Sequence, residues 1–211
     1  VNGLFVHTKH VYSDSAHYFI GIGTDLPQRI EQALLSSDAA THTVTSFNDR
    51  QFIERDLINM IKSGRTWYGE LFDLVLNYNF SFPTPFLTPG EDAVLVFNGI
   101  ARTIGTGSSS SFNINSGSAL NEDFPVVGIS NSSINAQARP FNEEFTFQPT
   151  GGAVPVSITF TKNDPITSKG WLNYLELNCR RDLRMIGDQL SFRDLSSIGM
   201  GNVAEMVLDQ A

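Results

Sequence analysis

A single cysteine, Cys179, is the first residue to consider for chemistry, because a thiolate is both a nucleophile and a metal ligand. A nucleophilic thiol needs partial exposure and a nearby histidine or helix terminus that lowers its pKa. Cys179 instead follows Leu175 and Leu177 on the apolar side of an alternating stretch, where a cysteine packs as a small hydrophobe. We therefore expect Cys179 to be a core residue.

Three histidines near the start of the chain, His7, His10 and His17, are candidate metal ligands. On a strand, residues three positions apart point to opposite faces, so His7 and His10 cannot converge on one ion without a turn. No cysteine or carboxylate stands at the offset that a tetrahedral site needs. The sequence predicts surface histidines, no metal site and no cofactor.

Acidic residues offer two further possibilities. The pairs Glu91 with Asp92 and Glu122 with Asp123 supply oxygens of the kind that calcium binds, although their spacing matches no calcium motif. Asp56 and Glu70 are conceivable as paired carboxylates for glycoside hydrolysis, but solvation and loop hydrogen bonding explain them more simply. No nucleophile, base and oxyanion donor come together, so we expect this chain not to be an enzyme.

The elements that position these residues begin with the stretch 170–183, whose side chains alternate. One face carries Trp171, Leu175, Leu177 and Cys179, and the other carries Glu176, Asn178 and Arg180. A period of two predicts a strand with one buried face and one solvent-exposed face. We expect Trp171 at the core end of this strand, and Arg180 and Arg181 at its polar end.

Many further strands are predicted, bounded by Gly, Pro, Ser and Asn turns, for example 41–47, 71–82, 93–103, 111–115, 124–129, 143–148 and 154–162. One short helix is predicted near 50–62, because Phe52, Ile53, Leu57, Met60 and Ile61 form a helical stripe. The predicted fold is mainly β: an antiparallel, jelly-roll-like β-sandwich with this helix inserted.

Length and composition set the limits of the function. The 211 residues, of which 41% are hydrophobic and 17% charged, predict one folded domain over 1–211, with residues 1–20 alternatively ending a preceding domain. A net charge of −8 argues against nucleic acid, which needs basic clusters. No apolar run of about 18 residues occurs, so no transmembrane segment is predicted.

Residues 63–70 read SGRTWYGE, a string with no ordinary explanation in secondary structure. The string resembles the SGR-x-W-[FY]-GE motif of type IX secretion-system sortases (PorU-type), which are gingipain-like cysteine peptidases of Bacteroidetes. Other stretches match this family in the same order: HVYSDSAHYF at 10–19, WLNYLELNCRR at 171–181 and FRDLSSIGMGNV at 192–203.

The resemblance implies that this chain corresponds to the region upstream of the peptidase domain, which is expected after Ala211. The family's catalytic Cys and His lie in that domain, so no residue here inherits a catalytic role. The parent protein is expected at the cell surface, held by an outer-membrane β-barrel partner. There it would remove C-terminal sorting domains from secreted cargo and help attach the cargo to lipopolysaccharide.

Within SGRTWYGE, we expect Arg65 to pair with Glu70 across a turn, while Trp67 and Tyr68 fill the seam between the predicted helix and the sheet. This arrangement is either a structural clasp or a contact with another domain or partner. The predicted structural or interaction residues are Arg65, Trp67, Tyr68, Glu70, Trp171, Arg180 and Arg181. Two rival functions stay open: a carbohydrate-binding module that uses exposed Trp67, Tyr68 and Tyr78, and a structural spacer.

Overall fold

The computed structural model describes residues 4–6, 8, 17–23, 37–62, 66–105, 107–131 and 137–209. Its strands are β1 (His42–Val44), β2 (Ser46–Glu54), β3 (Leu71–Phe72), β4 (Asn77–Pro83), β5 (Ala93–Arg102), β6 (Ser109–Asn115), β7 (Asn121–Val127), β8 (Arg139–Phe147), β9 (Ala153–Thr161), β10 (Lys169–Asp182) and β11 (Ala204–Met206). Within the described ranges there is no helix, and hence no helix that is long and apolar enough to cross a membrane.

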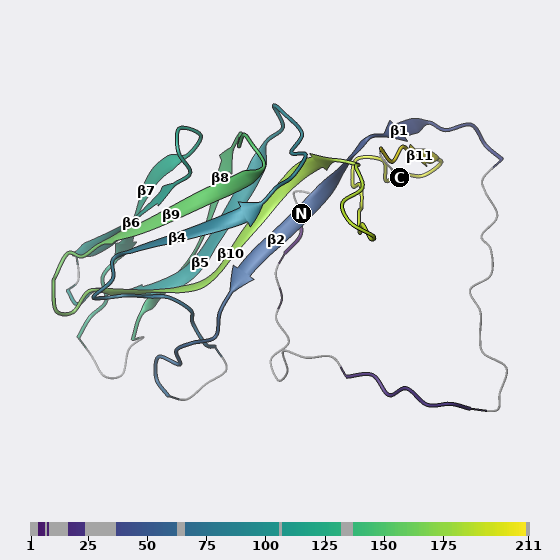
Figure 1. Ribbon diagram of the computed structural model, residues 1–211. Coiled ribbons are helices and arrows are strands. Elements are labelled where there is room, and N and C mark those ends of the chain that lie inside the picture. Colours follow the sequence, from purple (N-terminus) through teal and green to yellow (C-terminus); the bar gives the residue numbers. More distant parts are fainter. Residues whose placement is uncertain are drawn as a thin grey trace.

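Two antiparallel sheets pack face to face (Figure 1). One sheet has the order β2-β10-β5-β8, with β3 also paired to β10, and the other has the order β4-β9-β6-β7. From β3 onward the chain passes from one sheet to the other at each successive strand, except between β6 and β7, which are neighbours in the same sheet. This is the winding of a jelly roll. The predicted antiparallel, jelly-roll-like sandwich is confirmed.

Phenylalanine rings fill the space between the sheets. Phe112 of β6 is fully buried, with its ring centroid 4.6 Å from that of Phe160 and 5.1 Å from that of Phe97. Gly170 of β10 lies opposite this ring, and a Cβ atom at position 170 would come within 2.6 Å of the Phe112 ring. A glycine is therefore needed at this point of β10, because a side chain would displace the central ring of the core.

The prediction of a helix near 50–62 is wrong. Residues up to Glu54 belong to β2, which pairs along its length with the Tyr174–Asp182 part of β10. Ile53 packs against the core, whereas Phe52 on the opposite face is exposed. Backbone hydrogen bonds to a long neighbouring strand outweigh the helical spacing of the apolar residues, and Phe52 and Ile53 are themselves good strand formers.

Trp171 is buried, but on the face opposite to the predicted one. Leu172, Leu175 and Leu177 lie in the main core, whereas Trp171 belongs to a smaller cluster on the outer face of the sheet. The register between β10 and β5 shifts between Leu172 and Tyr174. This irregularity reverses the alternation of side chains, so the prediction that Trp171 shares a face with Leu175 is wrong.

The polar face of β10 is also less exposed than predicted, because Glu176 is only 1% exposed. Arg50 donates to Glu176 Oε2 (2.9 Å), and Asn178 donates to Glu176 Oε1 (2.9 Å). The Phe5 backbone N–H then donates to Asn178 Oδ1 (3.0 Å), so the start of the chain covers this face. Whether residues 1–20 end a preceding domain stays a prediction.

The strand predicted over 71–82 is interrupted between β3 and β4. Asp73 lies in the break and accepts hydrogen bonds from Lys162 and Lys169, at 2.6 and 2.7 Å. Two further strands, β1 and β11, form a separate parallel pair beside the sandwich (Figure 1).

Candidate functional site

A covering loop, residues 55–62 and 66–70, crosses the outer face of β10. Ile58 and Tyr68 exchange two backbone hydrogen bonds of 2.8 Å, which close the loop, and Gly69 N donates to Leu172 O (2.7 Å), which ties it to β10. The apolar side chains Ile58, Met60 and Tyr68 pack around Trp171. Residues 66–70 and the start of β10 therefore fold against each other.

Glu70 is buried at the end of the covering loop, and its partner is Arg55. The two side chains form an ion pair of 3.1 Å between Arg55 Nη1 and Glu70 Oε1, while Glu70 Oε2 is buried without a hydrogen-bond partner in the described part of the chain. Arg65, the predicted partner of Glu70, lies outside the described residues. The pairing of Arg65 with Glu70 thus stays a prediction, and Arg55 is a partner that sequence reasoning missed.

The aromatic residues proposed for a sugar platform occupy different environments. Trp67 is 46% exposed, whereas Tyr68 is half-buried and burial raises the pKa of its phenol. Tyr78 donates a hydrogen bond to Leu71 O (3.0 Å) and packs edge-on against Phe72, with centroids 4.9 Å apart. Of these three residues, Trp67 alone presents a largely exposed ring, which weakens the carbohydrate-binding alternative.

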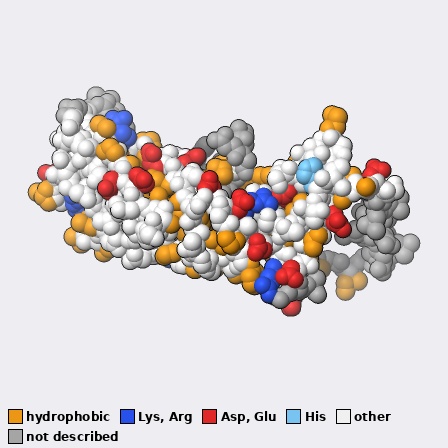
Figure 2. Space-filling view, turned by 90° about the horizontal axis from the view of Figure 1, so that it is seen from above, with side chains coloured by type: hydrophobic (Ala, Val, Ile, Leu, Met, Phe, Trp, Pro, Cys, Tyr) orange, Lys and Arg blue, Asp and Glu red, His pale blue; other side chains and the backbone are white. Residues whose placement is uncertain are grey.

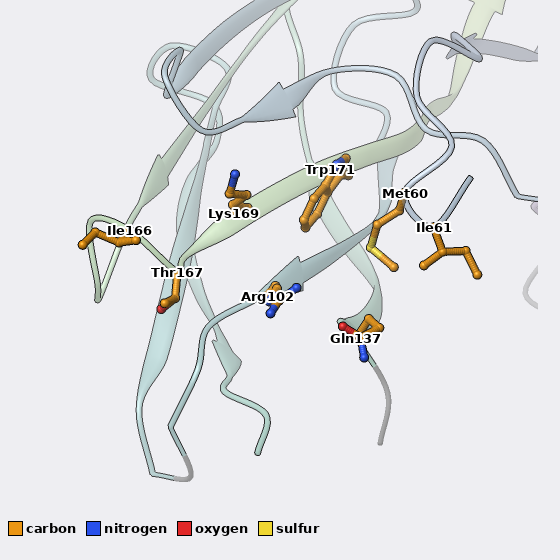
Figure 3. A pocket seen from close by; sticks show the side chains of 8 residues that line it. All are labelled: Met60, Ile61, Arg102, Gln137, Ile166, Thr167, Lys169 and Trp171. Atoms are coloured by element: carbon orange, nitrogen blue, oxygen red, sulfur yellow. The ribbon is translucent and has the colours of Figure 1, made fainter. Parts of the chain in front are cut away.

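Beside Trp171 the outer face is hollowed into a groove of about 390 Å³ (Figure 3). Arg102 at the end of β5 and Lys169 at the start of β10 stand opposite each other in register and form its polar part. Trp171 on β10 and Met60 and Ile61 of the covering loop form its apolar part. The groove thus places two cations next to an indole ring and aliphatic side chains.

The cations of this groove differ in their partners. Lys169 shares Asp73 with Lys162, and these two ammonium groups hold the pKa of Asp73 below its usual value. No hydrogen bond or ion pair joins the half-buried Arg102 side chain to another residue among those described. These four side chains carry an excess of two positive charges in a chain of net charge −8, whose acidic groups are scattered over the face in Figure 2.

At the other end of β10, Arg180 fixes the segment that follows the sheet. Its guanidinium donates to Asp194 Oδ1 (3.0 Å), Asn48 Oδ1 (3.2 Å) and Ser46 O (3.0 Å). Burial raises the pKa of Asp194, but hydrogen bonds from Ser196, Ser197 and Arg180 outweigh it and hold this pKa at about 2. The stretch FRDLSS is therefore anchored to the sandwich through its aspartate.

Arg181 is bound in the same way on the other face of β10. Its Nη1 lies 2.9 Å from Asp49 Oδ2, its Nε donates to Pro85 O (2.8 Å), and its guanidinium lies over the Phe47 ring. The predicted polar end of β10 thus exists, but the partners of Arg180 and Arg181 are groups of the chain itself. Their observed contacts are structural.

Cys179 lies in the core, as its alternation with Leu175 and Leu177 predicts. Burial raises the pKa of its thiol to about 12, which leaves the sulfur protonated near neutral pH and unsuited to nucleophilic attack. Over the described ranges, no three His, Cys, Asp or Glu side chains gather as a metal site would require. His7 and His10 lie outside those ranges.

Sequence reasoning missed Arg102, Asp73 and Asp194. Asp194 had a local signal, because an aspartate followed closely by serines is typical of a turn capped by its own side chain. Arg102 had no such local signal, since whether its guanidinium finds a partner depends on which distant carboxylates reach it. The groove therefore emerges only from the folded arrangement.

No family model matches this sequence, and no curated protein matches it. Among solved structures, the crystal structure of dimeric latent PorU from Porphyromonas gingivalis matches with a TM-score of 0.65 and 20% identity, over 82% of this chain and 16% of that chain. The CBM36-1 domain of a multidomain xylanase from the hindgut metagenome of Trinervitermes trinervoides gives a TM-score of 0.37 and 11% identity, over 61% of this chain and 96% of that chain.

A pentameric capsid protein from metagenomic phage sequences gives a TM-score of 0.23 and 12% identity, over 53% of this chain and 64% of that chain. The scores for the xylanase module and the capsid protein are too low to carry weight. The match to PorU extends over most of this chain but over about one sixth of the PorU chain. This chain is therefore similar in fold to one region of PorU.

Proposed function

We propose that this chain is a non-catalytic accessory domain of a gingipain-like cysteine peptidase of the PorU type, a component of the type IX secretion system. In this role the sandwich positions a peptidase domain of the same chain at the cell surface. The peptidase would process the C-terminal sorting domains of secreted cargo, with an outer-membrane β-barrel protein as its anchor.

The observation that carries this proposal is the likeness in fold to PorU over 82% of the chain. The resemblance given above is a second ground for the proposal, because the strings at 63–70, 171–181 and 192–203 resemble those of PorU-type sortases in order and content. Fold likeness and motif order are different kinds of observation, and both favour the same family.

The places of these strings in the fold support a positioning role. The string at 171–181 lies within β10, Gly69 of the string at 63–70 donates to the backbone of β10, and Asp194 of the string at 192–203 binds Arg180 of β10. Described residues of all three strings therefore belong to one folded unit. Since Cys179 is buried and protonated, its chemistry adds nothing to a reaction, and the unit suits a platform.

The test is to produce residues 1–211 and the peptidase domain of the parent protein as separate polypeptides. We expect the two to copurify, and we expect processing of a cargo sorting domain in cells that lack residues 37–209 to be restored when this chain is supplied. A parent gene without a peptidase domain, or unchanged processing after deletion of 37–209, would contradict the proposal.

The same two polypeptides distinguish the carbohydrate-binding module from the structural spacer. Binding to a glycan array that is lost in a Trp67→Ala variant, without binding to the peptidase domain, would identify a carbohydrate-binding module. Absence of both glycan binding and peptidase-domain binding would indicate a structural spacer.

A further inference from the structure

We propose that the groove beside Trp171 binds a peptide segment in which a carboxylate stands next to an aliphatic side chain. This inference goes beyond the accessory role and does not depend on it. It rests on the shape of the groove, on a cation that has no partner among the described residues, and on the apolar residues around that cation.

Arg102 is the anchor of the proposed site. A guanidinium presents a planar set of N–H donors that matches the two oxygens of a carboxylate, and it stays charged at any physiological pH. No described residue uses these donors, although the side chain is half-buried. Lys169, opposite Arg102 in register, supplies a second positive group on the neighbouring strand. A carboxylate between the two would meet charge-assisted hydrogen bonds from both.

The apolar part of the groove sets the second requirement for a ligand. Ile61 and Ile166 remain largely exposed at its rim, and Trp171 and Met60 extend the apolar surface inward. A simple anion would leave this surface in contact with water, whereas an aliphatic side chain would cover it. The volume of about 390 Å³ is at the small end of ligand sites, which typically measure about 300–1,000 Å³, and suits a few side-chain groups.

Charge restricts the ligand further. The local excess of two positive charges is enough for one or two carboxylates, while the net charge of −8 on the whole chain repels long polyanions. The Thr167 hydroxyl on the groove wall is buried and has no hydrogen-bond partner among the described residues, so it offers one more polar contact. A short acidic and apolar peptide segment satisfies all these features together.

The experiment is an NMR titration of ¹⁵N-labelled residues 1–211 with the peptide N-acetyl-Leu-Asp-Leu-amide. The sequence has two tryptophans, of which Trp171 lines the groove and Trp67 does not, so their indole N–H signals serve as site and internal control. The matched peptide N-acetyl-Leu-Asn-Leu-amide keeps the shape and removes the charge. Inorganic phosphate is the third probe, because it has charge without an apolar part.

We expect the Asp peptide to shift the Trp171 indole and the Lys169 amide with a millimolar dissociation constant, and to leave Trp67 unmoved. We expect Arg102→Gln, and separately the Asn peptide, to weaken binding by about tenfold or more, because each removes a charge-assisted contact. The control Arg184→Gln changes an arginine that lies over Phe86, beyond the other end of β10, and should bind as the unaltered protein does.

Three results would overturn the proposal. These are equal binding of the Asp and Asn peptides, unchanged binding by Arg102→Gln, and shifts of the groove signals by phosphate but not by the Asp peptide. Arg102→Gln is a fair test of binding, because its side chain has no described partner to lose on substitution. A native amide spectrum of the variant checks that its fold is retained.

Discussion

The two ends of β10 place arginines in opposite states. Near Asp182, Arg180 and Arg181 are held by Asp194 and Asp49, so their charges are neutralised within the chain. Near Lys169, the side chain of Arg102 on the adjacent strand has no described partner and faces a groove. The comparison teaches that an arginine in a polar cluster is structural where the fold supplies a carboxylate, and is available for binding where it does not.

The supply of carboxylates explains this difference. The segment after β10 returns to the sheet and delivers Asp194 to Arg180. At the groove end, the carboxylate of Asp73 is shared by Lys162 and Lys169, and no described carboxylate pairs with Arg102. Within the described part of the chain, the arginines at one end of β10 have carboxylate partners and Arg102 at the other end has none, and each of the following predictions tests this asymmetry.

The largest effect is expected from Asp194→Ala. The substitution leaves the Arg180 guanidinium without its carboxylate and the Ser197 backbone N–H without its acceptor. Breaking such a pair by removing one partner costs about 3–5 kcal/mol in the free energy of unfolding, which urea denaturation measures. The matched control is Asp209→Ala, whose exposed carboxylate lies 3.8 Å from Arg184 and should contribute less than about 0.5 kcal/mol. Equal losses in the two variants would contradict the asymmetry.

The same aspartate predicts a dependence of stability on pH. Its pKa is lowered from 3.8 to about 2 in the folded protein, so its contribution is present above pH 4 and is lost as the pH falls through 2. The shift corresponds to about 2 kcal/mol of unfolding free energy. We expect the stability difference between the unaltered protein and Asp194→Asn to shrink between pH 6 and pH 2.5, as followed by urea denaturation. A difference that stays constant over this range would refute the assignment.

A smaller effect is expected at the groove end from Arg55→Ala. Glu70 would lose the partner of its Oε1 atom while remaining buried, which costs about 1–3 kcal/mol. The companion variant Arg65→Ala tests the clasp predicted from the sequence. If thermal unfolding shows a larger loss for Arg65→Ala than for Arg55→Ala, the clasp, and not the Arg55 pair, holds the covering loop in place.

The smallest effect on stability is expected from Arg102→Gln. Because the guanidinium has no described partner, its removal should change the free energy of unfolding by less than about 0.5 kcal/mol. The variant that matters most for binding should therefore matter least for folding. A decrease of more than about 1 kcal/mol in the free energy of unfolding would indicate that Arg102 has a partner within the chain. The arginines at both ends of β10 would then be structural.

The sandwich was predictable where local patterns decide the structure. Leu175, Leu177 and Cys179 alternate with polar residues and do line the core, and the regular succession of short strands and turns predicts the jelly roll. Residues 50–54 were not predictable in this way, because their pairing with β10 joins segments that are distant in the sequence. The side of the sheet on which Trp171 lies could not be predicted for a similar reason, since the irregularity near Leu172 is a shift in the register with β5.

The candidate site was predictable only in part. The unusual string ending in Tyr68 and Glu70 correctly drew attention to a segment that packs on Trp171, but the burial of Glu176 could not be foreseen from a strand that looks half polar. The cover over Glu176 and Asn178 comes from Arg50 and Phe5, which lie far away in the sequence. That Arg102 has no partner among the described residues likewise depends on which distant segments the fold brings near it.

The parallel pair of β1 and β11 has a mechanical consequence. Its register runs from His42 opposite Ala204 to Val44 opposite Met206, and backbone bonds of 2.8 and 2.9 Å join Thr41 to Val203 and Val207 to Val44. Because the strands run in the same direction, opposite pulls on the chain before β1 and after β11 load these bonds together in shear. Tension along the chain would pass through this pair, and the sandwich behind it would stay unstretched until the pair slides apart.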